Sequence, residues 1–191
     1  GVSDPWSLIN PICFEEPLAP STAAQRAGTT IRLRPIREAF RKLSAVHQVL
    51  IVEGLGGLLV PLNERLTVAG LARQLHLPLV VVARAGLGTL NHTLLTLEHA
   101  RASGLAVAGV VLNQPVPPAR DAMTRVTIQT NPEILRRRLG VPVRGPLPFA
   151  PHHLSARGSV EELARWCEAQ LGRRWLMQLT HFRRYVRVTT S

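Results

Sequence analysis

The chain has 191 residues, of which 46% are hydrophobic and 4% aromatic, and a formal net charge of +11. This length and composition are typical of one domain with an aliphatic core, and no apolar run of 18 residues predicts a membrane span. No basic segment followed by an apolar one opens the sequence, so we expect no signal peptide. Cys13 and Cys167 fit no metal-binding spacing, which favours a cytoplasmic protein with reduced thiols.

The positive charge is almost entirely arginine and gathers toward the end of the chain. Lys42 is the only lysine among 23 basic residues, and no acidic residue follows Glu168. We interpret residues 173–191 as a basic tail and residues 1–172 as one domain. A basic tail can attract nucleic acid, but with one Tyr and no recognised reader motif the pattern favours a solvated, poorly ordered tail.

Helical and strand-like patterns alternate along the chain. Residues 1–33 are predicted to be a long loop with a short helix near 21–26. There follow a helix at 34–45, a strand at 46–52, a helix at 67–75, a strand at 77–83, a helix at 90–103, a strand at 106–113, a helix at 131–139, a strand at 141–148 and a helix at 159–171. The first three strands are nearly continuous β-branched runs, as expected for strands that are buried on both faces. The alternation predicts an α/β fold, a parallel sheet with right-handed crossovers.

Local signals mark several helix starts. Thr67 is placed to cap the helix at 67–75, and Asn131 followed by Pro132 is typical of a helix that begins there. Ser159, with Glu162 three residues later, predicts a capping box.

Polar and glycine-rich residues follow the predicted strands. In parallel sheets ligands collect beyond the carboxyl ends of the strands. Glu53 ends the first strand and precedes Gly54, Gly56 and Gly57, a tight turn whose amides can approach an anion. A carboxylate there can hold Mg²⁺ through oxygen, although a turn acid on the surface is the simpler alternative.

The next two strand ends carry complementary groups. The strand at 77–83 leads through a loop with Gly86 and Gly88 into a helix, and first-turn N–H groups of a helix bind carboxylate or phosphate. Asn113 ends the following strand, and its side-chain amide offers one donor and one acceptor, as an adenine edge does.

These stretches, in this order, resemble the dethiobiotin synthetase family. The resemblance covers roughly residues 8–150 and is carried by the strings INPICFEEPLAPSTAAQ, VEGLGGLLVPL, LGTLNHTLLTLE and NPEILRRRLGVPVRGPLPF. It implies a three-layer parallel sheet of the P-loop NTPase type. It also implies an ATP- and Mg²⁺-dependent ligase that closes 7,8-diaminopelargonate with CO₂ into the cyclic urea of dethiobiotin, in biotin biosynthesis.

The resemblance also implies residue roles and a partner. Glu53 matches the metal ligand, and the nucleotide-binding positions are Glu53, Gly54, Gly56, Asn113 and Pro148. The substrate-binding positions are Gly57, Gly86, Leu87, Gly88, Thr89 and Asn91. In the family the loop at 86–91 receives the substrate carboxylate across a dimer interface, so a homodimer is expected.

One family feature does not occur in the sequence. No GxxxxGK[ST] string is present, and Lys42 lies in a predicted helix rather than a glycine loop. We therefore expect an amino-terminally truncated form of the fold, with little activity of this chain alone and no assignable catalytic residue. Two alternatives stay open at this point: a regulatory or amidotransferase-related nucleotide-binding domain, and a basic nucleic-acid-binding module.

Overall fold

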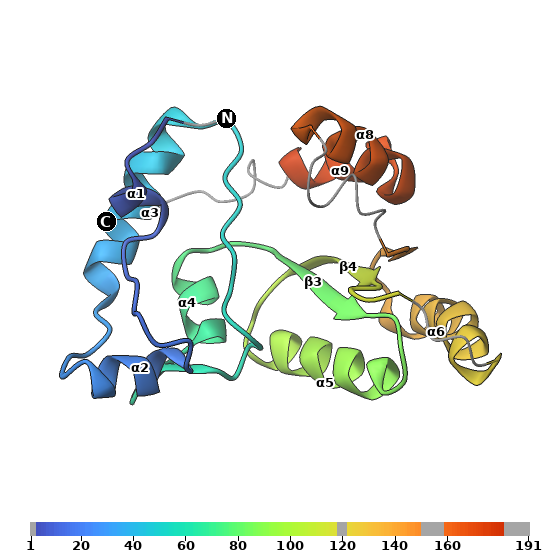
Figure 1. Ribbon diagram of the computed structural model, residues 1–191, viewed down its shortest axis with the longest axis horizontal. Coiled ribbons are helices and arrows are strands. Elements are labelled where there is room, and N and C mark those ends of the chain that lie inside the picture. Colours follow the sequence, from blue (N-terminus) through green and yellow to red (C-terminus); the bar gives the residue numbers. More distant parts are fainter. Residues whose placement is uncertain (1–2, 118–121, 150–158, 182–191) are drawn as a thin grey trace. The chain divides into compact units, whose positions relative to one another are not determined.

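The computed structural model describes residues 3–117, 122–149 and 159–181. The chain forms two compact units, Gly1–His76 and Leu77–Ser191, and each is described by itself. Helices and strands of both are labelled in Figure 1.

In its described residues the first unit combines four helices with a small antiparallel hairpin. Its elements are α1 (Trp6–Ile9), α2 (Pro20–Arg26), α3 (Leu33–Val46), β1 (Pro61–Asn63), β2 (Leu66–Thr67) and α4 (Val68–Gln74). Ala24, Ile31 and Leu62 form its buried core. The helices predicted near 21–26, 34–45 and 67–75 are confirmed. The Thr67 hydroxyl accepts a hydrogen bond from the Gly70 N–H at 3.3 Å, as a capping residue should.

The strand predicted at 46–52 is wrong. Val46 ends α3, and residues 47–54 form neither helix nor strand. Ile51 is 88% exposed and Val49 is 52% exposed. A β-branched run favours extended backbone, but a strand requires a neighbour that pairs with its N–H and C=O groups. In the described part of this unit the only strands are β1 and β2, and they pair with each other.

The second unit is built on a parallel sheet. β3 (Leu79–Arg84), β4 (Val107–Asn113) and β5 (Val143–Leu147) lie in the order β3-β4-β5, and both pairs are parallel. The three strands predicted in this region are confirmed, and so is the α/β fold class. β4 is buried along almost its whole length, whereas residues alternate between half-buried and exposed along β3.

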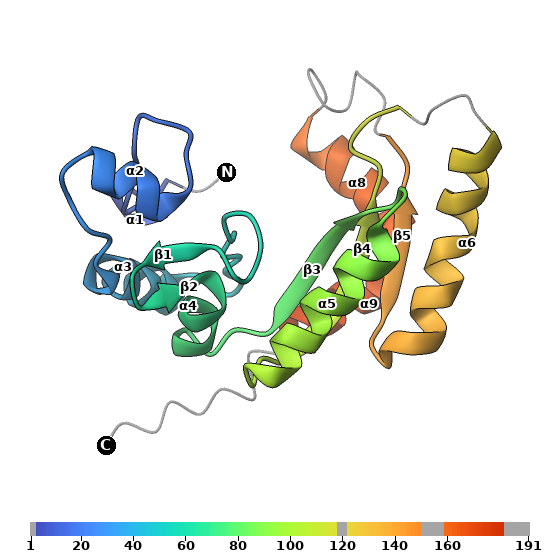
Figure 2. The same ribbon diagram turned by 90° about the horizontal axis from the view of Figure 1, so that it is seen from below.

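Helices cover both faces of this sheet (Figure 2). α5 (Thr89–Ala102) and α6 (Ala122–Leu139) pack on one face, and α8 (Val160–Leu171) and α9 (Arg173–His181) lie on the other. The largest buried side chains of the first interface are Leu97, Val110, Leu112, Leu135 and Leu139. The unit thus has the predicted three layers. The capping box between Ser159 and Glu162 is confirmed at the start of α8.

α6 does not begin at Asn131, as the Asn-Pro pair had predicted. The helix already runs from Ala122, with Pro132 inside it and buried. Thr127 and Thr130 donate to the carbonyls of Met123 and Val126, four residues back, which is the helical pattern in this earlier stretch. Asn131 therefore lies in the interior of the helix, and its side chain is free for tertiary contacts.

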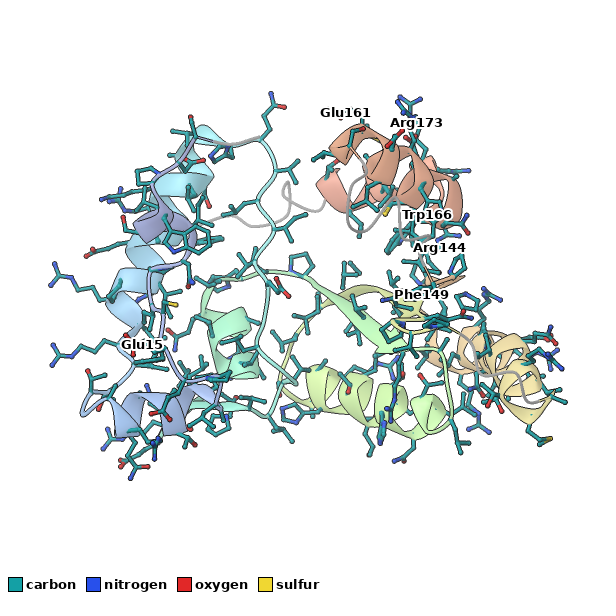
Figure 3. The ribbon with its side chains drawn as sticks, in the orientation of Figure 1. Glu15, Arg144, Phe149, Glu161, Trp166 and Arg173 are labelled. Atoms are coloured by element: carbon teal, nitrogen blue, oxygen red, sulfur yellow. The ribbon has the colours of Figure 1, made fainter. Side chains whose placement is uncertain are left out.

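The start of the expected basic tail is ordered as α9. Trp175 is 2% exposed, and its indole lies over Gly109 of β4, where a Cβ would come within 2.8 Å of Cζ2. The guanidinium of Arg144 lies 5.7 Å from the centre of the Trp175 ring. Arg144 projects from β5 toward the layer that contains Trp166 (Figure 3). Residues 182–191 of the expected tail lie outside the described residues, and the expected division at residue 172 stays a prediction.

Two smaller expectations concern the cysteines and the membrane. Cys13 and Cys167 are both free thiols. In the described ranges, no helix combines the length and the apolarity that a membrane crossing needs.

The packing of Trp175 predicts a large effect on stability. Trp175→Ala should lower the free energy of unfolding by about 3 to 5 kcal/mol, because a large buried ring is replaced by a cavity. Trp6→Ala, which truncates a 68% exposed tryptophan, should change it by only about 0.5 kcal/mol. Urea titrations followed by far-ultraviolet circular dichroism measure both, and equal effects would show that α9 does not depend on this contact.

Candidate functional site

The carboxyl ends of the three parallel strands meet at one rim of the second unit. The Ala85 N–H, just after β3, donates to the Asn113 carbonyl at the end of β4 at 2.9 Å. The Gln114 N–H donates to the carbonyl of Leu147, the last residue of β5, at 3.0 Å. Backbone hydrogen bonds thus join all three strand ends, and the loops that leave them start from fixed positions.

The loop after β3 leads into α5 through a left-handed glycine. Gly88 has φ +88°, a conformation that L side chains rarely adopt, and the Thr89 N–H donates to the Gly86 carbonyl at 3.3 Å. At a helix start the first N–H groups lack intrahelical acceptors. Here the Thr89 N–H donates to Gly86 and the His92 N–H to Gly88, which leaves the N–H groups of Leu90 and Asn91 without an acceptor among the described residues. Leu87 is 84% exposed at the tip of the loop.

The two polar side chains of this segment differ in access. The Thr89 hydroxyl is buried and lies 3.2 Å from the hydroxyl of Thr93, one turn further along α5. Asn91 is exposed. A ligand at this helix start therefore meets the Asn91 side chain and backbone N–H groups, while the Thr89 hydroxyl serves packing.

Asn113 and Pro148 lie on the neighbouring strand ends. Asn113 is half-buried, and its backbone carbonyl is already used by Ala85. No hydrogen bond to its side-chain amide is present among the described residues. Pro148 is exposed and directly follows β5. The two residues can offer an amide edge and an apolar ring surface to a flat heterocycle such as adenine.

Two residues of α6 that sequence reasoning did not select as site residues bond to the backbone of the sheet and of the loop after β3. Asn131 is buried, and its amide nitrogen lies 3.5 Å from the Ala85 carbonyl oxygen and 3.4 Å from that of Gly86. Arg136 donates to the carbonyls of Val143 and Gly145 in β5, at 3.3 and 3.0 Å. For Asn131, an available signal was its position four residues before Leu135 on the apolar stripe of α6.

The predicted glycine turn lies in the first unit. Glu53 is exposed and follows a segment that is neither helix nor strand. The prediction that Glu53 stands at the end of a strand is therefore wrong. Gly56 has φ +63°, and a Cβ there would lie 2.9 Å from Cγ2 of Val60. The Val60 N–H donates to the Gly57 carbonyl at 3.0 Å, which closes the turn.

The structure therefore brings together one of the two predicted groups of site residues. The residues that share the rim of the second unit are Gly86, Leu87, Gly88, Thr89, Asn91, Asn113 and Pro148. Glu53, Gly54, Gly56 and Gly57 belong to the first unit, and their place beside that rim stays a prediction. Across the described ranges no three His, Cys, Asp or Glu side chains gather as metal ligands.

The turn at Gly56 can be tested through stability. Gly56→Ala should destabilise the protein by at least about 1 to 2 kcal/mol, because an alanine would be strained in the left-handed region and would press on Val60. Gly57→Ala is the matched control, since no atom lies within 4 Å of a Cβ there, and it should change stability by about 0.5 kcal/mol. Thermal unfolding of the two variants checks the difference, and equal losses would contradict this turn geometry.

The chain is similar to known proteins of one family. A family model described as an AAA domain matches residues 1–156. An ATP-dependent dethiobiotin synthetase BioD of Bacillus cereus (strain G9842) is 46% identical over 149 residues, which are 78% of this chain and 60% of the relative. The BioD of Anaeromyxobacter dehalogenans (strain 2CP-1) is 54% identical over 114 residues, 60% of this chain and 51% of the relative.

The chain thus spans between about half and three fifths of the length of the relatives it matches. The family match, at residues 1–156, includes the strand ends of the second unit. The chain belongs to the AAA domain family, and its resemblance to the ATP-dependent dethiobiotin synthetases is confirmed.

Proposed function

We propose that this chain is part of a dethiobiotin synthetase, which uses ATP to close 7,8-diaminopelargonate and CO₂ into a cyclic urea. The observation that carries the proposal is the rim of the second unit. There the segments that resemble the substrate and adenine sites of that family, residues 86–91, Asn113 and Pro148, lie at strand ends that backbone hydrogen bonds join. Relatives with 46% and 54% identity bear the name of this enzyme.

The proposed reaction has three steps. One amine of the substrate adds to CO₂ and loses a proton, which gives a carbamate. A carbamate oxygen attacks the γ-phosphorus of ATP, and ADP leaves, so that a mixed carbamic–phosphoric anhydride forms. The neighbouring amine then attacks the carbonyl carbon and expels phosphate, which closes the urea ring and releases a second proton. Such a reaction depends mainly on positioning and on neutralising phosphate charge.

The rim residues offer contacts for two ligand groups, the substrate carboxylate and the adenine ring. The first-turn N–H groups of α5 and the exposed Asn91 would bind the substrate carboxylate, because a helix start offers donors and a partial positive charge. Asn113 and Pro148 would hold the adenine ring. The carboxylate and the adenine are both remote from the reacting atoms, so these contacts orient the reactants.

Glu53 is the proposed ligand for Mg²⁺. Its carboxylate is exposed and makes no ion pair among the described residues, and an oxygen ligand of this kind fits the preference of Mg²⁺. Mg²⁺ commonly needs only one or two carboxylates in addition to phosphates and water, so a single acid is sufficient on the protein side. When bound, the ion would neutralise part of the triphosphate charge. Gly54, Gly56 and Gly57 would let the backbone approach the nucleotide and substrate closely.

The phosphate loop and the partner subunit complete the proposal. In the family that this chain resembles, a P-loop with its lysine precedes the segment matched here, so we propose full activity for a protein that carries that loop. The exposed Leu87 and the loop around it would meet a second copy of the protein, giving a two-fold homodimer.

Removal of the metal-binding charge gives a first test. In a longer form of the protein that includes a P-loop segment, Glu53→Gln should lower Mg²⁺-dependent turnover by about 10- to 100-fold, because a hydrogen bond or ligand contact to a charged group is lost. Glu64→Gln, at another exposed acid of the same unit, should leave turnover unchanged. Incorporation of labelled CO₂ measures both, and equal rates for Glu53→Gln and the parent would remove Glu53 from the site.

Truncation of the proposed adenine contact gives a second test. Asn113→Ala should raise the KM for ATP about fivefold with little change in kcat, because it removes binding that is equal in the ground and transition states. The backbone carbonyl that Ala85 uses is kept, so the rim should persist. Asn63→Ala is the control, since that amide donates to the Ile31 carbonyl within the first unit. A change in kcat alone would exclude a role in binding adenine.

A further inference from the structure

Asn131 occupies a position on α6 where an apolar residue would be expected. With Leu135 and Leu139 it forms a buried stripe at a spacing of four residues, and both leucines are at most 1% exposed. Asn131 itself is 6% exposed. A buried amide without partners is unfavourable, so the partners of this side chain should explain its presence.

Those partners are two successive carbonyls of the loop after β3. The Asn131 amide nitrogen carries two hydrogens, and it lies 3.5 Å from the Ala85 oxygen and 3.4 Å from the Gly86 oxygen. Both distances are at the long limit for a hydrogen bond, so the amide restrains the two neighbouring peptide groups through two weak contacts. The two residues are 46 and 45 positions away in sequence from Asn131, so the contact joins α6 to the start of the loop.

Ala85 and Gly86 also make backbone hydrogen bonds to other segments. The Ala85 N–H is held by β4 through the Asn113 carbonyl, and the Gly86 carbonyl also accepts from the Thr89 N–H. Of these hydrogen bonds, only those from Asn131 reach both Ala85 and Gly86, the two residues that precede the exposed Leu87. Without them, the carbonyl of the buried Ala85 would lose a protein donor, and the carbonyl of the half-buried Gly86 would keep only the Thr89 N–H.

We infer that Asn131 is a positioning residue for substrate binding: its side chain sets the path of residues 85–88 and thereby the direction of the first-turn N–H groups of α5. It acts through the loop and touches no reacting atom. This inference rests on the proposed function only in naming the ligand, since holding the loop is a separate property of the protein.

Two variants of Asn131 distinguish the effect of losing the N–H donor from the effect of changing the side-chain volume. Asn131→Leu keeps a similar size on an apolar stripe but has no donor, and Asn131→Asp keeps the shape but offers only acceptors when ionised. Thr130→Val is the matched control, because its hydroxyl donates to Val126 inside α6 and not to the loop. All are made in the longer protein that includes a P-loop segment.

The first readout is independent of activity. Amide hydrogen exchange at residues 86–89 should become about tenfold faster in both Asn131 variants, because the loop loses one of its restraints. Exchange in the middle of α5, at residues 94–97, should stay as in the parent protein, and Thr130→Val should change neither region. Unchanged exchange at 86–89 would overturn the inference, whether or not the protein makes dethiobiotin.

The second readout connects the loop to the substrate. The KM for 7,8-diaminopelargonate should rise about fivefold to tenfold in both variants, while the KM for ATP stays within about twofold, because only the carboxylate-binding segment is displaced. A lower melting temperature with both KM values unchanged would show that Asn131 is only structural and would overturn the inference. An inactive parent protein would instead refute the proposed function, and the exchange result would still decide whether Asn131 holds the loop.

Discussion

β4 is the element on which the second unit depends. It is buried on both faces, under α5 and α6 on one side and the Trp175 indole on the other, and its two edges are hydrogen-bonded to β3 and β5. Because all three strands are parallel, their carboxyl ends meet at one rim, and the bonds from Ala85 and Gln114 fix that rim. The placement of Asn113 beside the loop at Gly86 follows directly from this pairing.

Arginine side chains link the helices of this unit to each other and to the sheet. Arg136 reaches two carbonyls of β5, and Arg101 of α5 donates to the Leu139 carbonyl at the end of α6 at 2.6 Å. A planar guanidinium with five donors suits such bonds to several carbonyls better than a lysine ammonium does. Exposed ion pairs such as Arg137–Glu133, at 2.5 Å, contribute only about 0 to 1 kcal/mol each. These contacts give several arginines a structural role, so the high net charge does not require a nucleic-acid partner.

Strands and helix caps were predicted correctly from the sequence where the local pattern agreed with the tertiary environment. β3 and β4 were predictable because continuous β-branched runs favour strands, and β5 was predictable from a weaker apolar pattern. The expected burial on both faces holds for β4, whereas alternate residues of β3 are exposed. The caps at Thr67 and Ser159 were predictable because they are local by nature. The segment at 46–52 has the same pattern, but a run of side chains cannot reveal whether a partner strand is beside it. Two of the interactions that hold the second unit were also invisible locally. Trp175 finds its place because Gly109, 66 residues earlier, leaves room for the ring, and Asn131 was interpreted as a cap because its loop partners are distant in sequence.

A crystal structure of the longer protein with a non-hydrolysable ATP analogue, Mg²⁺ and 7,8-diaminopelargonate would test the central claim most directly. We expect adenine between Asn113 and Pro148, the substrate carboxylate on the first-turn N–H groups of α5, and a Glu53 oxygen about 2.1 Å from the metal. Each of these contacts can be read from the same density. Adenine and substrate bound away from the carboxyl ends of β3, β4 and β5 would contradict the account.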